Sequence, residues 1–249
     1  MALLPEHQVH VHIDGRPDAD VEIAQQSVLS SDDAPAKQRP AVVRAGTAVL
    51  ADRVRVVLGE HRRVVVGLAG PPGAGKSTLA AALADALHDV HAVVVPFDGF
   101  HLANNVLADR QLSDRKGALE TFDTAGYSAL LQRLGSSLDT VYAPMFDRSI
   151  EQPVAGAIAV EPDCRVVITE GNYLLVDEFS MVEARQTMTE VWYVDLDEQT
   201  RIDRLEHRHI AHGKTPEQAR SWTRGTDQAN AEIVGSYREA ADLHLIWAS

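Results

Sequence analysis

The stretch GPPGAGKST, residues 70–78, lies between the apolar run RVVVGLA and the run LAAALADALHD. A short run rich in Val is typical of a buried strand, whereas a longer run of Ala and Leu favours a helix. The stretch fits the pattern G-x-x-x-x-G-K-[ST] in full, in the strand–loop–helix context that the pattern requires. It therefore predicts an α/β fold of the P-loop NTPase type, with a mainly parallel sheet.

Such a loop binds phosphate through its backbone, because glycines let N–H groups turn inward and the following helix N-terminus is partly positive. In loops of this pattern the lysine, here Lys76, reaches the β- and γ-phosphates, and the hydroxyl of Ser77 ligates Mg²⁺. The alternative is a glycine-rich turn at a helix start. We expect a nucleoside triphosphate to be bound by the whole stretch: Gly70, Pro71, Pro72, Gly73, Ala74, Gly75, Lys76, Ser77 and Thr78.

Short apolar runs alternate with longer helical ones in the rest of the chain, as in a sheet covered by helices on both faces. Val43, Leu50 and Val57 recur at every seventh position, which predicts a helix that begins after Pro40 and ends near Gly59. We expect a three-layer domain over residues 41–249. Its central five-stranded sheet is predicted from the stretches 63–69, 91–97, 165–170, 190–196 and 243–247.

Residues 1–40 have a different character and are expected to form an N-terminal extension. VHVHID alternates apolar and polar residues, which favours a small β-hairpin, and SSDDAPAKQRP resembles a linker. His7, His10 and His12 fit the polar face of an exposed strand better than a metal site, because no recognised ligand spacing follows them. The extension either caps an edge of the sheet or mediates a homodimer, and the sequence leaves both open.

Composition limits the partners. The 249 residues carry a formal net charge of −13, which argues against nucleic acid or an acidic membrane as the main partner. No apolar run is as long as a membrane span, and the N-terminus does not resemble a signal peptide. The one cysteine, Cys164, fits a buried small residue better than a nucleophile. We therefore expect a cytoplasmic protein.

Other classes of P-loop protein fit less well. DTAG (residues 123–126) matches the D-x-x-G pattern of GTPases, but it follows a polar stretch and the chain has no N-K-x-D motif. The transporter signature L-S-G-G-Q is also absent from the sequence. A small-molecule kinase needs three further elements: a base at the acceptor hydroxyl, a carboxylate beside Mg²⁺, and cations for the transferred phosphoryl group.

The two carboxylates have candidates at predicted strand ends. Asp98 follows the second strand in VVVPFDGFH, at the edge where ligands of open α/β sheets bind. It is the candidate base, and a turn aspartate is the alternative. Glu170 ends the third strand and would hold Mg²⁺ or its water if that strand neighbours the P-loop strand. A surface glutamate at a strand end is the alternative.

The cations are predicted on a helix. Arg201, Arg204 and Arg208 are spaced i, i+3 and i+7, so they share one helix face. Arg204 and Arg208 are the candidates for the transferred phosphoryl group, and Arg204 also for the nucleotide. The alternative is a solvated helix paired with its own acids. A glycine at 213 and a second helix start at Thr215 favour a mobile helical lid over about residues 198–225.

These motifs together resemble the superfamily of phosphoribulokinase, uridine kinase and bacterial pantothenate kinase. The similarity covers about residues 41–249, and the nearest branch is described as nucleoside/nucleotide kinase-like or fructose-transport-associated kinases. It rests, in chain order, on GPPGAGKST, PFDGFH, RKGALETFD, YAPMFDR, EGNYLL and RHIAHGK. Leu119 and Phe122 depart from the pantothenate kinase pattern K-G-F-P-E-S-Y-D, so the sequence speaks against pantothenate.

The resemblance implies ATP, Mg²⁺ and transfer of the γ-phosphoryl group to a hydroxyl of a small polar metabolite, with Asp98 as the catalytic aspartate. A sugar or sugar-like compound is our leading expectation, and a nucleoside or pantothenate is the alternative. A non-catalytic ATP-binding regulatory protein is the more remote alternative. Arg148 contacts the substrate or pairs with a carboxylate, both being open. The candidate substrate-binding residues are Asp98, His101, Arg115, Lys116, Arg148 and Tyr173.

Overall fold

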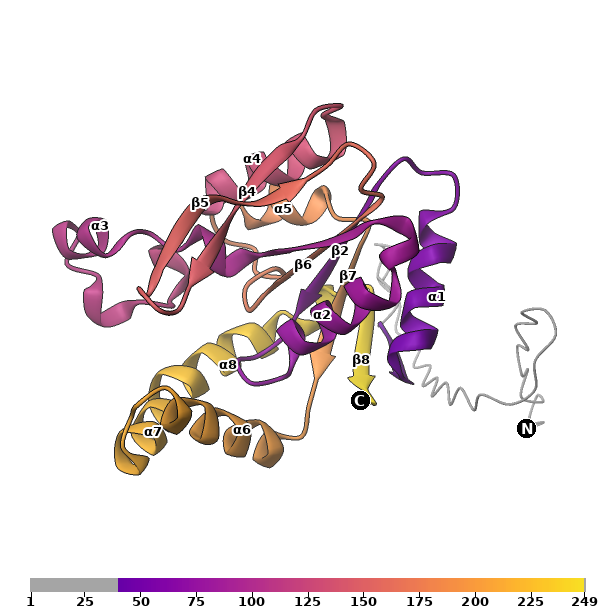
Figure 1. Cartoon of the computed structure of the whole chain (residues 1–249). Helices are drawn as coiled ribbons and strands as arrows, with labels where there is room; N and C mark the ends of the chain where they lie inside the picture. Colours follow the sequence, from indigo (N-terminus) through magenta and orange to yellow (C-terminus); the bar gives the residue numbers. More distant parts are fainter. Residues whose placement is uncertain (1–39, 249) are drawn as a thin grey trace, which may run out of the picture.

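The structure, a computed structural model, describes residues 40–248. Its centre is a six-stranded sheet in the order β1-β8-β7-β2-β6-β3, and every neighbouring pair in it is parallel (Figure 1). The strands are β1 (Ala41–Ala45), β2 (Val64–Ala69), β3 (Ala92–Pro96), β6 (Val166–Gly171), β7 (Glu190–Asp195) and β8 (Leu243–Trp247).

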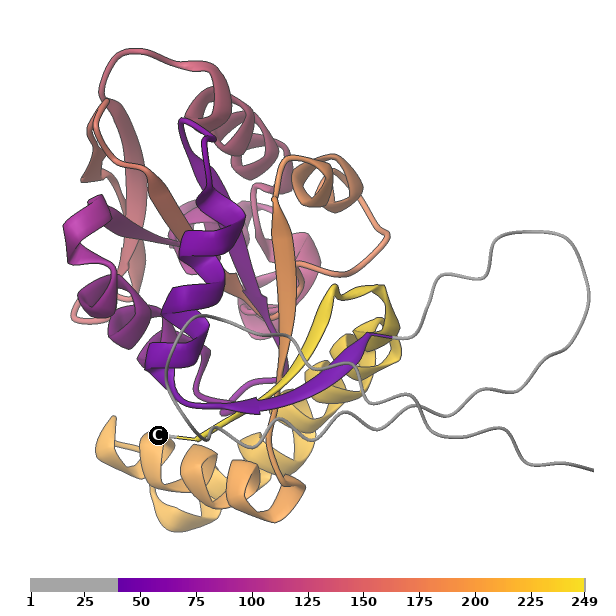
Figure 2. The ribbon, with the colours of Figure 1, turned by 90° about the vertical axis from the view of Figure 1, so that its right-hand side faces the viewer.

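The sheet has one strand more than the sequence pattern predicts. The five predicted stretches are confirmed as β2, β3, β6, β7 and β8, but residues 41–45, expected as part of a helix, form β1. β1 pairs with β8 from Ala41 beside Leu243 to Ala45 beside Trp247 (Figure 2). Its partner is the last strand of the chain, so the local seven-residue spacing carries no sign of the pairing. The helix itself, α1 (Thr47–Leu58), ends at Gly59 as predicted.

Helices cover both faces of the sheet, which confirms the three-layer prediction. On one face, buried residues of α1 and α2 (Lys76–Ala86) pack against apolar side chains of β2, β6, β7 and β8. On the other face, α4 (Thr124–Ser136), α5 (Met181–Gln186) and α8 (Gln228–Ser236) contribute Leu131, Met181 and Val234 to a second core. The strands are apolar on both sides because both sides are buried.

A second, two-stranded antiparallel sheet was not predicted. It consists of β4 (Val141–Asp147) and β5 (Gln152–Val160), and it lies with the short helix α3 (Asn104–Asp109) at one end of the molecule (Figure 1). Val141, Ala143 and Val160 anchor this hairpin in the core beside α4.

Two helices form the region predicted as a lid. α6 (Glu198–Ala211) begins at the N-cap Asp197, and α7 (Pro216–Trp222) begins at Thr215 with a capping box. A π-helical turn over Thr223–Asp227 then leads into α8. No helix within residues 40–248 has the length and apolar character needed to cross a membrane. The expectations for residues 1–39, including the three histidines, lie outside the described residues.

Candidate active site

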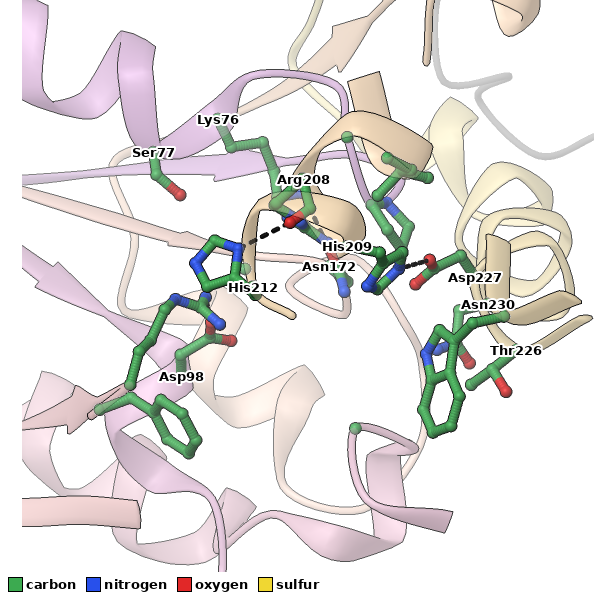
Figure 3. A pocket seen from close by; sticks show the side chains of 18 of the residues that line it. Lys76, Ser77, Asp98, Asn172, Arg208, His209, His212, Thr226, Asp227 and Asn230 are labelled. Atoms are coloured by element: carbon green, nitrogen blue, oxygen red, sulfur yellow. Dashed lines mark hydrogen bonds and ion pairs between the residues drawn. The ribbon is translucent and has the colours of Figure 1, made fainter. Parts of the chain in front are cut away.

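A cavity of about 1000 Å³ opens where the strands of the main sheet end (Figure 3). Its walls come from the P-loop, the ends of β3 and β6, the loop before α4, the β4–β5 hairpin, and the lid helices. This is large for a ligand cavity, and it can hold a nucleotide and a small acceptor together. Predicted site residues that line it are Pro72, Gly73, Gly75, Lys76, Ser77, Thr78, Asp98, His101, Lys116, Arg148, Glu170, Arg204 and Arg208.

The P-loop has the backbone that phosphate binding requires. Gly73 and Gly75 have φ values of +83° and +93°, a region that side chains disfavour. Gly75 is the N-cap of α2, so the first N–H groups of that helix lack partners within it and face the cavity side of the loop. A nucleotide phosphate placed there would accept hydrogen bonds from these groups.

The lid packs directly on this loop. A Cβ atom on Gly73 would lie 2.8 Å from Cγ of Leu205 and 3.0 Å from the carbonyl oxygen of Arg201, both in α6. On Gly75 it would lie 3.4 Å from Nη1 of Arg204. The small residues of the loop therefore allow α6 to approach the position of the phosphates.

We expect Gly73→Ala to destabilise the fold and weaken ATP binding. The positive φ costs about 1–3 kcal/mol for a residue with a side chain, and the clash with Leu205 adds to that cost. Gly213→Ala is the matched control, because Gly213 has a φ of +91° but no heavy atom within 4 Å of an added Cβ. Urea unfolding and the KM for ATP measure both effects. Equal losses in the two variants would contradict the role of this packing.

Lys76 is buried, with 6% of its surface exposed. Its Nζ donates to the carbonyl oxygen of Pro71 at 3.0 Å and to Oδ1 of Asn172 at 2.7 Å. Burial lowers the pKa of Lys76 to about 8, although Glu170 and Asp98 act to raise it. Sequence reasoning missed Asn172, which follows the strand end of β6 in the motif EGN.

Ser77 and Glu170 meet at the base of the cavity. The hydroxyl of Ser77 donates to Oε1 of Glu170 at 2.8 Å. The condition set for Glu170 in the sequence analysis is met, because β6 pairs with the P-loop strand β2 and Glu170 stands beside Leu68. Burial raises the pKa of Glu170, and the negative charge of Asp98 raises it further. A cation bound here would favour the charged form of Glu170 and so oppose both of these effects on its pKa.

The donor set fits Mg²⁺. The hydroxyl of Ser77 and the carboxylate of Glu170 are the hard oxygen ligands that this ion prefers, and it commonly retains waters and phosphate oxygens besides. Within residues 40–248, no three His, Cys, Asp or Glu side chains gather into a metal site of their own. An ion at Ser77 and Glu170 would thus depend on nucleotide phosphates for the rest of its coordination.

Asp98 lies in a 3₁₀ turn, Phe97–Phe100, directly after β3. Because Pro96 of β3 pairs with Glu170 of β6, the two carboxylates stand at adjacent strand ends. Oδ2 of Asp98 accepts a hydrogen bond from Nη2 of Arg148 at 3.3 Å. Arg148 was expected either to contact the substrate or to pair with a carboxylate. The structure contains the pair with Asp98, and the guanidinium group also lines the cavity.

His101 is tied to the same turn. Its Nδ1 lies 2.8 Å from the backbone carbonyl oxygen of Asp98, and a carbonyl only accepts, so Nδ1 carries the proton. Burial lowers the pKa of His101 below its usual value of 6.5, so the ring is neutral at pH 7. Nε2 is then a hydrogen-bond acceptor, available to a hydroxyl group of a ligand.

The three arginines of α6 have different environments. Arg204 and Arg208 line the cavity, and Arg208 is close enough to Lys76 to help lower its pKa (Figure 3). Arg201 is buried instead, with Nη2 donating to Oε1 of Gln228. Spacing alone left open which arginines face inward, and the packing of α6 on the P-loop decides it.

Other predicted substrate contacts are arranged differently. Nζ of Lys116 donates to Oδ1 of Asn104 at 2.8 Å and to the backbone oxygen of Glu151. Arg115 pairs with Glu120 at 2.7 Å and is not part of the cavity wall. Tyr173 is 1% exposed, and its hydroxyl donates to the backbone oxygen of Gly117 at 2.9 Å, so it supports this loop from beneath.

Part of the cavity wall escaped sequence reasoning. On the lid side it contains His209, Trp222, Thr226, Asp227 and Asn230. Only His209 lies in a motif noted above, RHIAHGK, where it was not singled out; the other four follow no motif and come from the end of α7, the π-helical turn and α8. The DTAG motif, by contrast, has a structural role, since the side chain of its aspartate caps α4 by accepting from the amide of Gly126.

Known proteins resemble most of this chain. A family model described as an AAA domain matches residues 51–202. A "Putative uridine kinase" of Schizosaccharomyces pombe is 35% identical over 208 residues, covering 79% of this chain and 88% of that protein. A "Pantothenate kinase" of Mycolicibacterium vanbaalenii is 32% identical over 145 residues, covering 52% of this chain and 46% of that protein.

A solved structure shows the same arrangement. The "putative fructose transport system kinase" from Silicibacter sp. TM1040 is 39% identical, with a TM-score of 0.75, covering 80% of this chain and 98% of that one. The P-loop motif, the strand order and these relatives all point to the same family. The chain therefore belongs to the P-loop kinases of the uridine kinase and pantothenate kinase superfamily, which are ATP-dependent phosphotransferases with a hydroxyl acceptor.

Proposed function

We propose that this kinase transfers the γ-phosphoryl group of ATP to a hydroxyl of a sugar or sugar-like metabolite, with Asp98 as the base. One observation carries the proposal. Lys76, the carboxylates of Asp98 and Glu170, and the lid arginines Arg204 and Arg208 line a single cavity, which also has room beside Asp98 for an acceptor. The solved structure named as a fructose transport system kinase supports the sugar assignment by similarity.

In the proposed reaction, Asp98 takes the proton of the acceptor hydroxyl as its oxygen bonds to the γ-phosphorus. The bond from that phosphorus to the bridging oxygen of ADP breaks, and ADP leaves. Lys76 stabilises the charge on the β- and γ-phosphates, and Arg204 and Arg208 stabilise the transferred group from the lid side. Arg148 orients the carboxylate of Asp98, which it contacts at 3.3 Å.

Mg²⁺, held by Ser77 and Glu170, would supply positive charge to the nucleotide phosphates. Within residues 40–248, the hydroxyl of Ser77 donates to one acceptor, the carboxylate of Glu170. It would give up that hydrogen bond to ligate the ion. Glu170 would hold the ion or one of its waters. Burial of Glu170 keeps bulk water away from this side of the phosphates.

A screen of acceptors tests the proposal. The full-length protein is incubated with ATP, Mg²⁺ and one of a set of sugars, nucleosides or pantothenate, and ADP release is measured with mass spectrometry of the product. We expect a phosphorylated sugar. Phosphorylation of pantothenate or a nucleoside alone would contradict the acceptor class, and no product with any compound would contradict the reaction.

We expect Arg208→Ala and Arg204→Ala to lower kcat by about 10²-fold each, with a smaller change in the KM for ATP. The reason is that charge on the transferred group is larger in the transition state than in bound ATP. Arg220→Ala is the control, because Arg220 is an exposed lid arginine that does not line the cavity. Equal losses in kcat and in ATP affinity would argue for ground-state nucleotide binding instead.

A nucleoside is the second candidate acceptor, since Phe146 and Trp222 line the cavity and either ring offers a surface on which a base stacks. The ring of Phe146 already contacts His101, with ring centroids 4.8 Å apart, and lies under Lys116 and Arg148. Trp222 has Nζ of Lys214 4.6 Å over its ring, so a base could stack on it only at the opposite face. The name of the fission yeast relative also favours this alternative.

A further inference from the structure

The lid side of the cavity carries a polar cluster that the proposed reaction does not use. We define the lid cluster as His209, Trp222, Thr226, Asp227 and Asn230. Its polar members face the cavity across from Asp98 (Figure 3). They come from α6, the end of α7, the π-helical turn and α8. Such π-helical turns are frequent at functional sites.

Two members of the lid cluster are buried, and each has polar atoms without a partner in the described part of the chain. Asp227 and Asn230 are 7% and 9% exposed. Nε2 of His209 lies 2.7 Å from Oδ2 of Asp227, which uses one oxygen of that carboxylate. Within residues 40–248, neither the side-chain amide of Asn230 nor Oδ1 of Asp227 makes a hydrogen bond to another side chain or the backbone. Both residues line the cavity, so these atoms are open to it and available to a ligand.

The chemistry of the cluster suits a sugar. A carboxylate oxygen accepts hydrogen bonds from hydroxyl groups, and an amide both donates and accepts. The hydroxyl of Thr226 lines the same wall, and Trp222 adds an apolar surface for the C–H groups of a sugar ring. Ligand cavities commonly combine one aromatic surface with a few polar groups that fix orientation.

The charges on the acceptor side favour an uncharged ligand. Arg148 is paired with Asp98, Lys116 is bonded to Asn104 and the backbone of Glu151, and Lys214 lies 4.6 Å over the ring of Trp222. Each of these cations thus has a partner within the described part of the chain. Asp227 and Glu151 also line the cavity, and their charge would repel an anionic acceptor.

We propose that the lid cluster binds the end of the acceptor that lies away from Asp98, and that the acceptor is an uncharged sugar with hydroxyl groups at that end. The inference rests on the proposed function and narrows it, because it separates neutral sugars from anionic acceptors such as D-glycerate and pantothenate. Asp227 and Asn230 are then acceptor-binding residues that determine specificity. His209 fixes the orientation of Asp227.

The test compares Asp227→Asn with wild type on defined probes. ADP release is measured with D-fructose, D-ribose, D-glucose, a deoxy derivative of each, uridine, D-glycerate and pantothenate. We expect turnover of a neutral sugar by wild type, and a rise of about 10- to 100-fold in its KM in Asp227→Asn, because the sugar hydroxyl then meets a neutral amide instead of a charged carboxylate. The KM for ATP and the melting temperature should stay near wild type.

Asp203→Asn is the matched control. Asp203 is an acid on α6 whose Oδ1 accepts from Gln199 at the surface, and it does not line the cavity. It should leave the KM of every probe unchanged. A deoxy derivative that lacks the hydroxyl bound by Asp227 should lose affinity in wild type and lose little more in Asp227→Asn.

The outcomes separate the two proposals. Turnover of a neutral sugar with an unchanged KM in Asp227→Asn would overturn the lid-cluster assignment and leave the proposed function standing. A lower melting temperature with the same KM would assign the cluster to lid stability alone, which also overturns it. Turnover of only D-glycerate, pantothenate or uridine, or of no probe, would overturn both the sugar assignment and this inference.

Discussion

Asp98→Asn is expected to lower kcat by about 10²–10⁴-fold, the range that general-base catalysis contributes. The amide keeps the shape of the side chain and can still accept from Arg148, which lies 3.3 Å from Oδ2 of the native carboxylate. It cannot take the proton of the acceptor hydroxyl. Because the P-loop contacts are unaffected, the KM for ATP should change little. Single-turnover phosphoryl transfer with the identified acceptor measures the effect directly.

Asp109→Asn is the control for that experiment, since Asp109 is an exposed acid at the end of α3 and lies outside the cavity wall. It should transfer the phosphoryl group at the wild-type rate. A rate for Asp98→Asn within about threefold of wild type, well below the general-base range, would remove Asp98 from the mechanism. The base would then be sought among the other acids of the motifs RKGALETFD and YAPMFDR, namely Glu120, Asp123 and Asp147.

Lys76→Ala is expected to lower kcat/KM for ATP by about 10³-fold or more, because the phosphates lose a charged donor in a water-poor site. The lysine is 6% exposed, and its hydrogen-bond partners within residues 40–248 are the carbonyl oxygen of Pro71 and Oδ1 of Asn172. Lys76→Met separates charge from packing, since methionine fills the space without a charge. If the methionine variant keeps near wild-type turnover, the assignment of Lys76 to the phosphates is wrong.

The same lysine predicts a pH dependence. Its pKa is lowered to about 8, so the cation that binds phosphate is present below that pH and is lost above it. For the free enzyme, kcat/KM for ATP should fall about tenfold per pH unit above the pKa. Saturating ATP stabilises the charged form and should move the fall in kcat to higher pH. In Lys76→Met this fall should disappear, whereas a fall that persists would point to another group.

Much of the phosphate side could be predicted from the sequence, because its determinants are local. GPPGAGKST needs only its own glycines and the strand and helix beside it to form a phosphate-binding loop. Asp98 and Glu170 were placed at strand ends by the short apolar runs before them. Parallel strands of one sheet terminate on the same side, but the strand order β2-β6-β3 that makes the two acids neighbours came from the structure.

The edge of the sheet could not be predicted in the same way. The local sign that residues 41–45 lie outside α1 is Gly46, which is the N-cap of that helix, but a glycine does not say that a strand precedes it. Residues 41–45 form β1 because β8 offers an unpaired edge, and β8 is the last strand of the chain. Strand propensity depends on such partners more than helix propensity does, so a local period is an incomplete guide.

The acceptor side was decided by tertiary structure. The spacing of Arg201, Arg204 and Arg208 defines a helix face, but only the contact of α6 with Gly73 buries the first and turns the other two to the cavity. Tyr173 was predicted to contact the substrate, but its hydroxyl donates to the backbone oxygen of Gly117 and so supports the loop that contains this glycine. Asp227 and Asn230 follow no pattern and reach the cavity through a π-helical turn.

The sequence by itself determined the chemistry at the phosphates, namely which residues bind them and at which edge of an α/β sheet. Tertiary structure decided the acceptor side, meaning which lid residues face the cavity and which cations are already paired. The physical reason is the range of the interactions. A phosphate loop is a short continuous segment whose backbone makes the contacts, while the acceptor wall is assembled from side chains of distant segments, whose orientation depends on packing between them.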